Sequence, residues 1–188
     1  MRLGYYGMPL ACVLALLVGP ALRADESDGK VHLGGLKSKA PAGWEAVSTT
    51  SKNRPFQWRV NGGQGKDSDA EVTVFYFGLN GAGSADENVA RWKSLFIPPK
   101  GKTIDDVAKV DKIRLGDDVS VYVDISGTYR FRPRPQAPDS EIQLKPDYRL
   151  LEGILLTSRG PYYLRIIGPA KTVGDHKADF DEWLMGFK

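Results

Sequence analysis

Cysteine is almost absent from this chain, which has a single one, Cys12, among 188 residues. One cysteine near the N-terminus supplies neither a disulfide framework nor a set of thiolate ligands. Histidine is also scarce, with only His32 and His176, so the usual ligand sets for zinc are not available. We therefore expect a fold held by packing alone, with no metal ion and no cofactor.

An excess of either charge is lacking too. The chain has 26 basic and 23 acidic residues, a formal net charge of +3. Arg2 and Arg23 lie within the first 24 residues, and without them 24 basic residues remain with the same 23 acidic ones. Such a balance gives no reason to expect nucleic acid or an anionic membrane surface as a partner.

The one notable apolar run, Met8 to Val18, is too short for a membrane span of about 20 residues. It follows a short basic start and precedes small residues that include Ala21 and Ala24, the layout of a secretory signal peptide. We expect residues 1–24 to be this signal, with cleavage after Ala21 or after Ala24. The mature chain then has no transmembrane segment and works outside the cytoplasm, as a periplasmic or extracellular protein of a bacterial envelope.

The rest of the chain has the length of one domain. Residues 25–39 are polar, contain several glycines and show no clear periodicity, so we expect a flexible lead or a loosely docked arm. A Pro–Gly turn then precedes Trp44, which can pack onto the core. We place the folded domain at residues 40–188.

Alternation of apolar and polar residues, or β-branched and aromatic enrichment, predicts a series of strands. The most regular alternation runs from Val119 to Ile125, with a possible continuation through Thr128 and Tyr129. Residues 132–147 hold four prolines and are expected to be irregular. The expected strands are residues 56–60, 71–77, 110–115, 119–125, 148–157 and 162–167.

Two helices are expected among these strands. Ser84 and Glu87 have the spacing of a capping box, and Val89, Trp92 and Phe96 recur on one helical face. A second amphipathic helix is expected from about Lys171 to Gly186. The order predicts a single α+β domain with an antiparallel-rich β-sheet and two packing α-helices.

Several local patterns resemble the PsbP-like domains, named after the extrinsic protein PsbP of photosystem II. They are Pro41–Trp44, the helical segment Asn88–Trp92, and the hairpin from Gly160-Pro161-Tyr162-Tyr163 to Gly168-Pro169. The resemblance covers Leu36–Lys188 and is greatest to uncharacterised exported bacterial proteins. It implies an α-β-α sandwich and, by analogy, an assembly or docking role. It implies no catalytic residue, because no functional residue of the family can be matched here.

Common catalytic motifs are not found in the sequence. Gly65-Lys66 is not followed by Ser or Thr, and Gly81-Ala82-Gly83 lacks the third glycine of a dinucleotide fingerprint. No Gly-x-Ser-x-Gly motif occurs that would place a nucleophilic serine. The sequence does not decide whether the protein is an enzyme, but the lack of catalytic motifs favours a non-catalytic protein.

Two carboxylates occur inside apolar strands and have two interpretations. Asp124 and Glu152 are either buried acids with raised pKa values or partners of strand arginines such as Arg149 and Arg165. The structural ion pair is the favoured interpretation.

Asn88 and Arg91 on the first helix are candidate binding residues for a polar or anionic ligand. The alternative is structural, with Trp92 in the core and Arg91 covering its edge or bonding to a loop. The alternative is favoured here, although a cleft beside Asn88 and Arg91 is retained as a possible ligand site.

The segment Arg130–Gln136 alternates basic residues with Phe or Pro, and proline stiffens such a chain toward an extended shape. Long loops on a rigid sheet often carry recognition, but a tolerated insertion is equally compatible with the pattern. Arg130, Arg132 and Arg134 are the binding residues that we single out here.

Together these observations favour a non-catalytic binding or docking module of the envelope. Its expected partner is an envelope protein or a cell-wall component. The alternative is a small-ligand binder or hydrolase with a cleft near Asn88 and Arg91, and a third is a purely structural domain.

Overall fold

The structure, a computed structural model, describes residues 29–115, 118–134, 137 and 139–188. The predicted signal peptide, residues 1–24, lies outside the described residues. So do Gly116 and Asp117, which lie between the strands predicted at residues 110–115 and 119–125.

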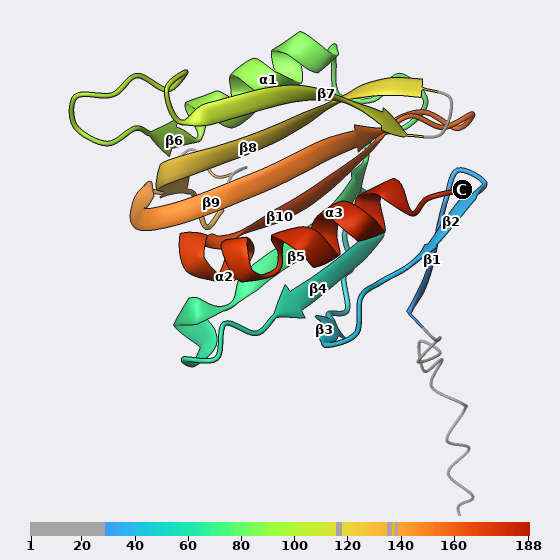
Figure 1. Cartoon of the computed structure of the whole chain (residues 1–188), viewed down its shortest axis with the longest axis horizontal. Helices are drawn as coiled ribbons and strands as arrows, with labels where there is room; N and C mark the ends of the chain where they lie inside the picture. The colour runs from blue at the N-terminus through green and yellow to red at the C-terminus, as the bar shows by residue number, and fades with distance from the viewer. Residues whose placement is uncertain (1–28, 116–117, 135–136, 138) are drawn as a thin grey trace, which may run out of the picture.

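One antiparallel sheet of eight strands organises the described chain (Figure 1). Its order is β3-β4-β5-β10-β9-β8-β6, with β7 also paired to β8. The strands are β3 (Trp44–Ala46), β4 (Phe56–Val60), β5 (Ala70–Tyr76), β6 (Phe96–Ile97), β7 (Ala108–Leu115), β8 (Asp118–Phe131), β9 (Gln143–Leu155) and β10 (Tyr162–Pro169). The expected α+β class with an antiparallel sheet is confirmed.

Helices pack on both faces of this sheet and bury two separate cores. Helix α1 (Ala85–Ser94) buries Trp92 against β8, β9 and β10. Helices α2 (Ala170–Asp175) and α3 (Lys177–Met185) bury Phe180 and Trp183 against the opposite face, where Trp44 and Trp58 also lie. The layers are therefore α-β-α. None of the helices in the described part of the chain is long and apolar enough to span a membrane.

The capping box predicted for α1 is present. The Ser84 hydroxyl accepts a hydrogen bond from the Glu87 amide at 3.2 Å, and the Glu87 carboxylate accepts one from the Ser84 amide at 2.7 Å. These two bonds satisfy amide groups that the first turn of a helix leaves without partners. Sequence signals at a helix start are local, so they could be recognised without the tertiary structure.

The N-terminal segment differs from the expected flexible lead. Strands β1 (Lys30–Leu33) and β2 (Leu36–Lys39) form a hairpin around Gly34 and Gly35, whose φ values are 58° and 102°. A tight hairpin turn of this kind needs positive φ at both central residues, which glycine adopts without strain. Val31 and Leu33 are buried in the same core as Trp44 and Trp58, so residues 30–39 pack as part of the fold.

Two further boundaries differ from the sequence prediction. The last helix is divided at His176 into α2 and α3, just after Gly174 and Asp175, both weak helix formers. Residues 132–147 were predicted to be irregular, but β9 already begins at Gln143. Strand β8 continues to Phe131, two residues beyond the continuation predicted through Tyr129. Pro146 fits within β9 because a bulge there leaves it outside the regular ladder.

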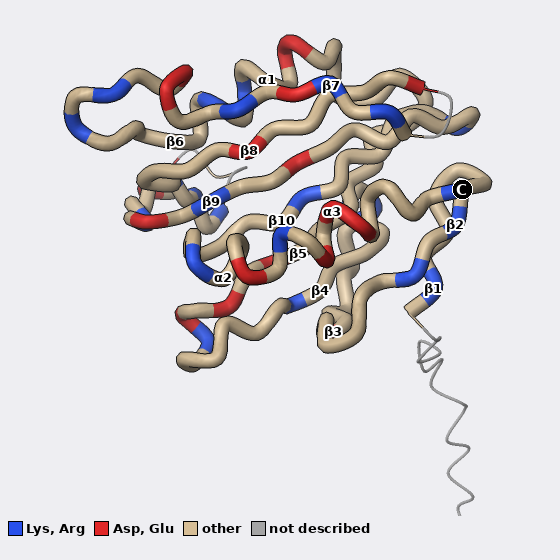
Figure 2. Tube along the Cα trace, viewed as in Figure 1, with Lys and Arg blue, Asp and Glu red and all other residues tan. Residues whose placement is uncertain are grey.

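Helix α1 covers only part of its face of the sheet, and the site described below lies on the uncovered part. α1 covers β8, β9 and part of β10, whereas Gln57, Arg59 and Glu71 on β4 and β5 remain partly or fully exposed on the same face. Positive and negative residues are interspersed along the described chain (Figure 2).

Candidate functional site

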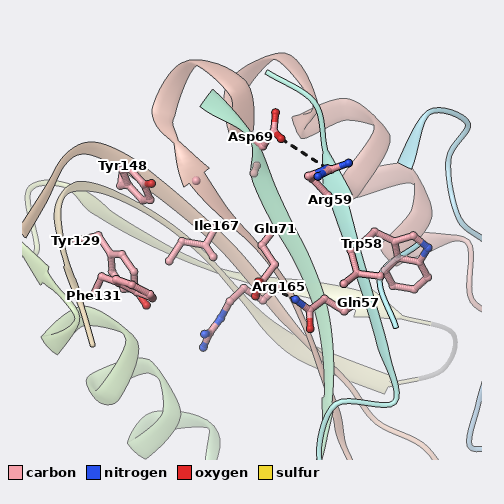
Figure 3. Close-up of a pocket in the computed structure, with 13 residues that line it drawn as sticks. Gln57, Trp58, Arg59, Asp69, Glu71, Tyr129, Phe131, Tyr148, Arg165 and Ile167 are labelled. Carbon is pink, nitrogen blue, oxygen red and sulfur yellow. Dashed lines mark hydrogen bonds and ion pairs between the residues drawn. The ribbon is translucent and has the colours of Figure 1, made fainter. Parts of the chain in front are cut away.

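A cleft of about 360 Å³ opens on the part of this sheet face that α1 leaves uncovered (Figure 3). We call it the sheet cleft. Its floor is made by β4, β5 and β10, and one wall is made by the ends of β8 and β9. Its lining residues are Val47, Gln57, Trp58, Arg59, Asp69, Ala70, Glu71, Tyr129, Phe131, Tyr148, Arg165, Ile167 and Gly168.

Cross-strand register gathers the polar residues of the floor. Arg59 pairs with Glu71, which in turn pairs with Ile167, and Gln57 pairs with Thr73, which pairs with Arg165. Directly opposed residues of antiparallel strands lie on the same face of the sheet. Two adjacent rows of side chains, drawn from three strands distant in sequence, therefore share the floor of the sheet cleft.

The polar side chains of the floor bond to one another. Gln57 Nε2 donates to Glu71 Oε2 at 2.9 Å, and Thr73 Oγ1 donates to Glu71 Oε1 at 2.8 Å. Arg59 forms an ion pair with Glu45 and lies 3.6 Å from the Asp69 carboxylate. The Glu71 and Asp69 carboxylates are thus held in place before any ligand arrives.

A buried ion pair extends the second row under α1. Arg165 Nε donates to Glu152 Oε2 at 2.8 Å and Nη2 donates to Oε1 at 3.3 Å. Glu152 is 1% exposed, and burial raises its pKa although the Arg165 guanidinium opposes this. The guanidinium also lies over the Phe75 ring at 4.9 Å. This is the structural ion pair favoured for Glu152.

The second strand carboxylate is paired in the same way on the opposite face. Arg149 Nε donates to Asp124 Oδ1 at 2.8 Å, and its Nη2 donates to Oδ2 at 2.6 Å. This two-point geometry is the strong form of a carboxylate–guanidinium contact. Asp124 alternates with Val123 and Ile125, which are buried on the α1 face, so it lies on the opposite face and does not line the sheet cleft.

The wall opposite the polar floor is aromatic. Tyr129 and Tyr148 stack with ring centroids 5.9 Å apart and an interplanar angle of 13°, and Phe131 lies 6.2 Å from Tyr129. Burial raises the pKa of both tyrosine hydroxyls, which keeps them protonated and able to donate. The cleft thus has an aromatic side and a hydrogen-bonding side.

A bulge adjoins these tyrosines. The step from Gly127 to Tyr129 on β8 is opposed by the longer step from Tyr148 to Lys145 on β9, which inserts one extra residue. Bulges of this kind redirect side chains next to binding sites. Tyr148 opposes Gly127, and Tyr129 is two residues further along β8, so the two tyrosines lie on the same face beside the bulge.

Asn88 and Arg91, predicted as candidate binding residues, are brought together at the start of α1. The Asn88 side chain is fully buried, and its Nδ2 donates to the carbonyl oxygens of Gly83 at 3.2 Å and Ser84 at 2.8 Å. Arg91 donates to Asn88 Oδ1 and to the Ala82 carbonyl. Both side chains hold the turn before the helix, and neither lines the sheet cleft.

The three arginines of the Pro-rich segment lie at one end of the sheet. Arg130 is within β8, where its Nη1 donates to the Ser94 carbonyl at 3.3 Å, whereas Arg132 and Arg134 follow the strand. Arg134 Nη2 lies 3.4 Å from Asp139 Oδ2. All three are exposed. Pro135, Gln136 and Pro138 of this segment lie outside the described residues.

Histidines and carboxylates do not gather into a metal-binding group within the described residues. His32 is exposed on β1, and His176 lies 3.4 Å from Asp179 between α2 and α3.

The sheet cleft was not predicted from the sequence. One signal was available, because Glu71 and Thr73 alternate with Ala70, Val72 and Val74 in β5, which indicates one apolar and one partly polar face. Which of the other strands contribute to that polar face depends on their register, and a single strand carries no information about it.

Among known proteins, similarity to this chain is found at the level of solved structures. No protein-family model matches the chain, and no curated protein matches it. Among solved structures, the chain is similar to the solution structure of cyanobacterial PsbP (CyanoP) from Synechocystis sp. PCC 6803. The TM-score is 0.44 at 16% identity, and the match covers 88% of this chain and 89% of that chain. The α+β class follows from the strands and helices of this chain, and no residue takes a role from that protein.

Proposed function

We propose that this protein is an exported, non-catalytic binding module of a bacterial envelope that docks on a protein partner. The surface that we assign to this role is the hairpin end, defined as residues 130–134 and 139–145. The observation that carries the proposal is the exposure of apolar side chains at this end: Ile142 is 48% and Leu144 57% exposed, and Phe131, on the other face of the hairpin from Leu144, is 36% exposed. Exposed apolar groups gathered at one end of a fold are typical of interaction sites.

The charges of the hairpin end support a protein partner. The hairpin end has more basic than acidic residues: Arg130, Arg132, Arg134 and Lys145 against Asp139 and Glu141. Arginine and aromatic residues are enriched in protein interfaces, and arginine is frequent among the residues that dominate binding energy. Arg130 directly opposes Leu144 across the hairpin, so a basic and an apolar side chain share one face.

The alternative site beside Asn88 and Arg91 has less support. Both side chains are already bonded to the turn that precedes α1. A ligand there would have to displace bonds that stabilise the start of the helix.

The test is capture of a partner from solubilised envelope of the same organism, by the protein expressed from its full sequence. A variant with Arg130→Ala, Arg132→Ala and Arg134→Ala should retain less than about a tenth of the partner, because truncating one interface arginine often costs more than about 1 kcal/mol. The control variant removes three exposed cations elsewhere, with Lys100→Ala, Lys109→Ala and Lys112→Ala. Equal loss in both variants, or no loss in either, contradicts the proposal.

A further inference from the structure

The sheet cleft has no part in the docking role proposed above, apart from Phe131 at its rim. Its volume of about 360 Å³ falls in the range of roughly 300–1,000 Å³ typical of small-molecule sites. The charges and side chains that line the cleft determine which class of molecule it can bind.

The pairing of the arginines in the cleft argues against an anionic ligand. Arg59 is paired with Glu45 and Asp69, and Arg165 is paired with Glu152. Glu71 accepts hydrogen bonds from Gln57 and Thr73. An anion entering the cleft would find both arginines already paired with carboxylates, so its lost hydration would be poorly replaced.

The polar floor and the aromatic wall together argue against a purely apolar ligand. Gln57, Arg59 and Glu71 present donors and acceptors on the floor, and leaving them desolvated without partners would be costly. Tyr129 and Tyr148 present ring surface and hydroxyl groups on the other side. The ligand therefore needs an apolar face for the rings together with several hydroxyl or amide groups for the floor.

We infer that the sheet cleft binds an uncharged saccharide. A sugar ring has one face of C–H groups that can lie against an aromatic ring, and its edge carries hydroxyl groups. Carboxylate and amide side chains fixed by their neighbours suit such hydroxyls, because they accept or donate without first rearranging. Glu71 and Gln57 would bond the hydroxyl edge, and Tyr148 with Tyr129 would lie against the ring.

The backbone of the aromatic wall supports a binding role. Asp147, next to Tyr148, has φ of 54° and is the one non-glycine residue with positive φ in the described chain. Strained residues and bulges that persist in a fold are concentrated at functional sites. Here both features adjoin the same pair of tyrosines.

The test is titration of the protein, expressed from its full sequence, with maltose, cellobiose and N,N′-diacetylchitobiose by calorimetry and by saturation-transfer NMR. At least one of these uncharged disaccharides should bind, and glucose 6-phosphate and glucuronic acid should bind more weakly. Tyr148→Leu and Gln57→Ala should each weaken the binding about tenfold. Because these two substitutions lie on opposite sides of the cleft, a folding defect in one leaves the other informative.

Matched control variants make the same chemical changes outside the cleft. Tyr76→Leu alters a tyrosine that stacks on Tyr162 on the opposite sheet face, and Gln64→Ala alters an exposed loop residue. Both should bind the disaccharide as the native chain does. No binding by any of the three disaccharides, tighter binding of the charged sugars, or equal effects of cleft and control variants would overturn the inference. None of these outcomes depends on the hairpin end, so the docking proposal is tested separately.

Discussion

Asp147 is the non-glycine residue with a positive φ in the described part of the chain. Its φ of 54° lies in the left-handed region, which aspartate tolerates better than most residues and which β-branched residues adopt only at a cost. The side chain is exposed, so its conformational preference matters more than its packing. Asp147 lies in the bulge of β9, directly before Tyr148, which stacks on Tyr129.

The stability of Asp147 variants should therefore depend on how well each new residue tolerates a positive φ. We expect Asp147→Gly to change the free energy of unfolding by less than about 0.5 kcal/mol, because glycine adopts positive φ freely but loses more entropy on folding. Asp147→Val should destabilise by about 1–2 kcal/mol, because a β-branched side chain adopts the left-handed conformation at a greater cost than aspartate does. Urea denaturation of both variants measures the difference. Glu141→Val, at another exposed acidic position, is the control, and equal stability of the two valine variants would refute this account.

At the scale of elements, the sequence predicted what depends on neighbours along the chain. The capping box of α1 and the alternation in β8 could be recognised because each is encoded within a few residues. The end of β8 and the start of β9 were missed because Pro146 suggested an irregular segment, whereas the partner strand and a bulge accommodate it. The sheet cleft could not be predicted, since Gln57, Glu71, Tyr148 and Arg165 meet only through the register of separate strands.

The pairing of β9 with β10 includes the buried contact between Glu152 and Arg165. We expect Glu152→Gln to destabilise the protein by about 3 kcal/mol, because it leaves the Arg165 guanidinium largely buried without its counter-charge. The double variant Glu152→Leu with Arg165→Met should recover most of this loss, since well-packed apolar residues often replace a buried ion pair at little cost. Chemical denaturation of the two variants and of the native chain supplies the comparison. A double variant less stable than Glu152→Gln would show that the ion pair itself is strongly stabilising.

At the scale of the whole molecule, the N-terminal hairpin joins the two ends of the described chain. The Lys37 amide donates to the Lys188 carbonyl at 2.8 Å, and the Lys188 amide donates to the Lys37 carbonyl at 3.1 Å. Figure 1 shows β2 beside the C-terminus, next to the end of α3. The hairpin covers the aromatic core in which Trp44, Trp58 and Trp183 contact one another. The hairpin is therefore part of the folded unit, and a domain boundary at residue 40 would leave it out.

This contribution is measurable with one buried side chain of the hairpin. Leu33 is 1% exposed within the core, so Leu33→Ala should destabilise the protein by about 3 kcal/mol through lost burial and an unfilled cavity. Leu79→Ala makes the same chemical change at a side chain that is 69% exposed, and it should cost less than about 0.5 kcal/mol. The midpoint of cooperative denaturation gives both values. If Leu33→Ala unfolds at the same midpoint as Leu79→Ala, the hairpin is a detachable arm. A large shift in that midpoint would instead mean that the cooperative unit begins at β1, and that a fragment starting at residue 40 has lost part of its core.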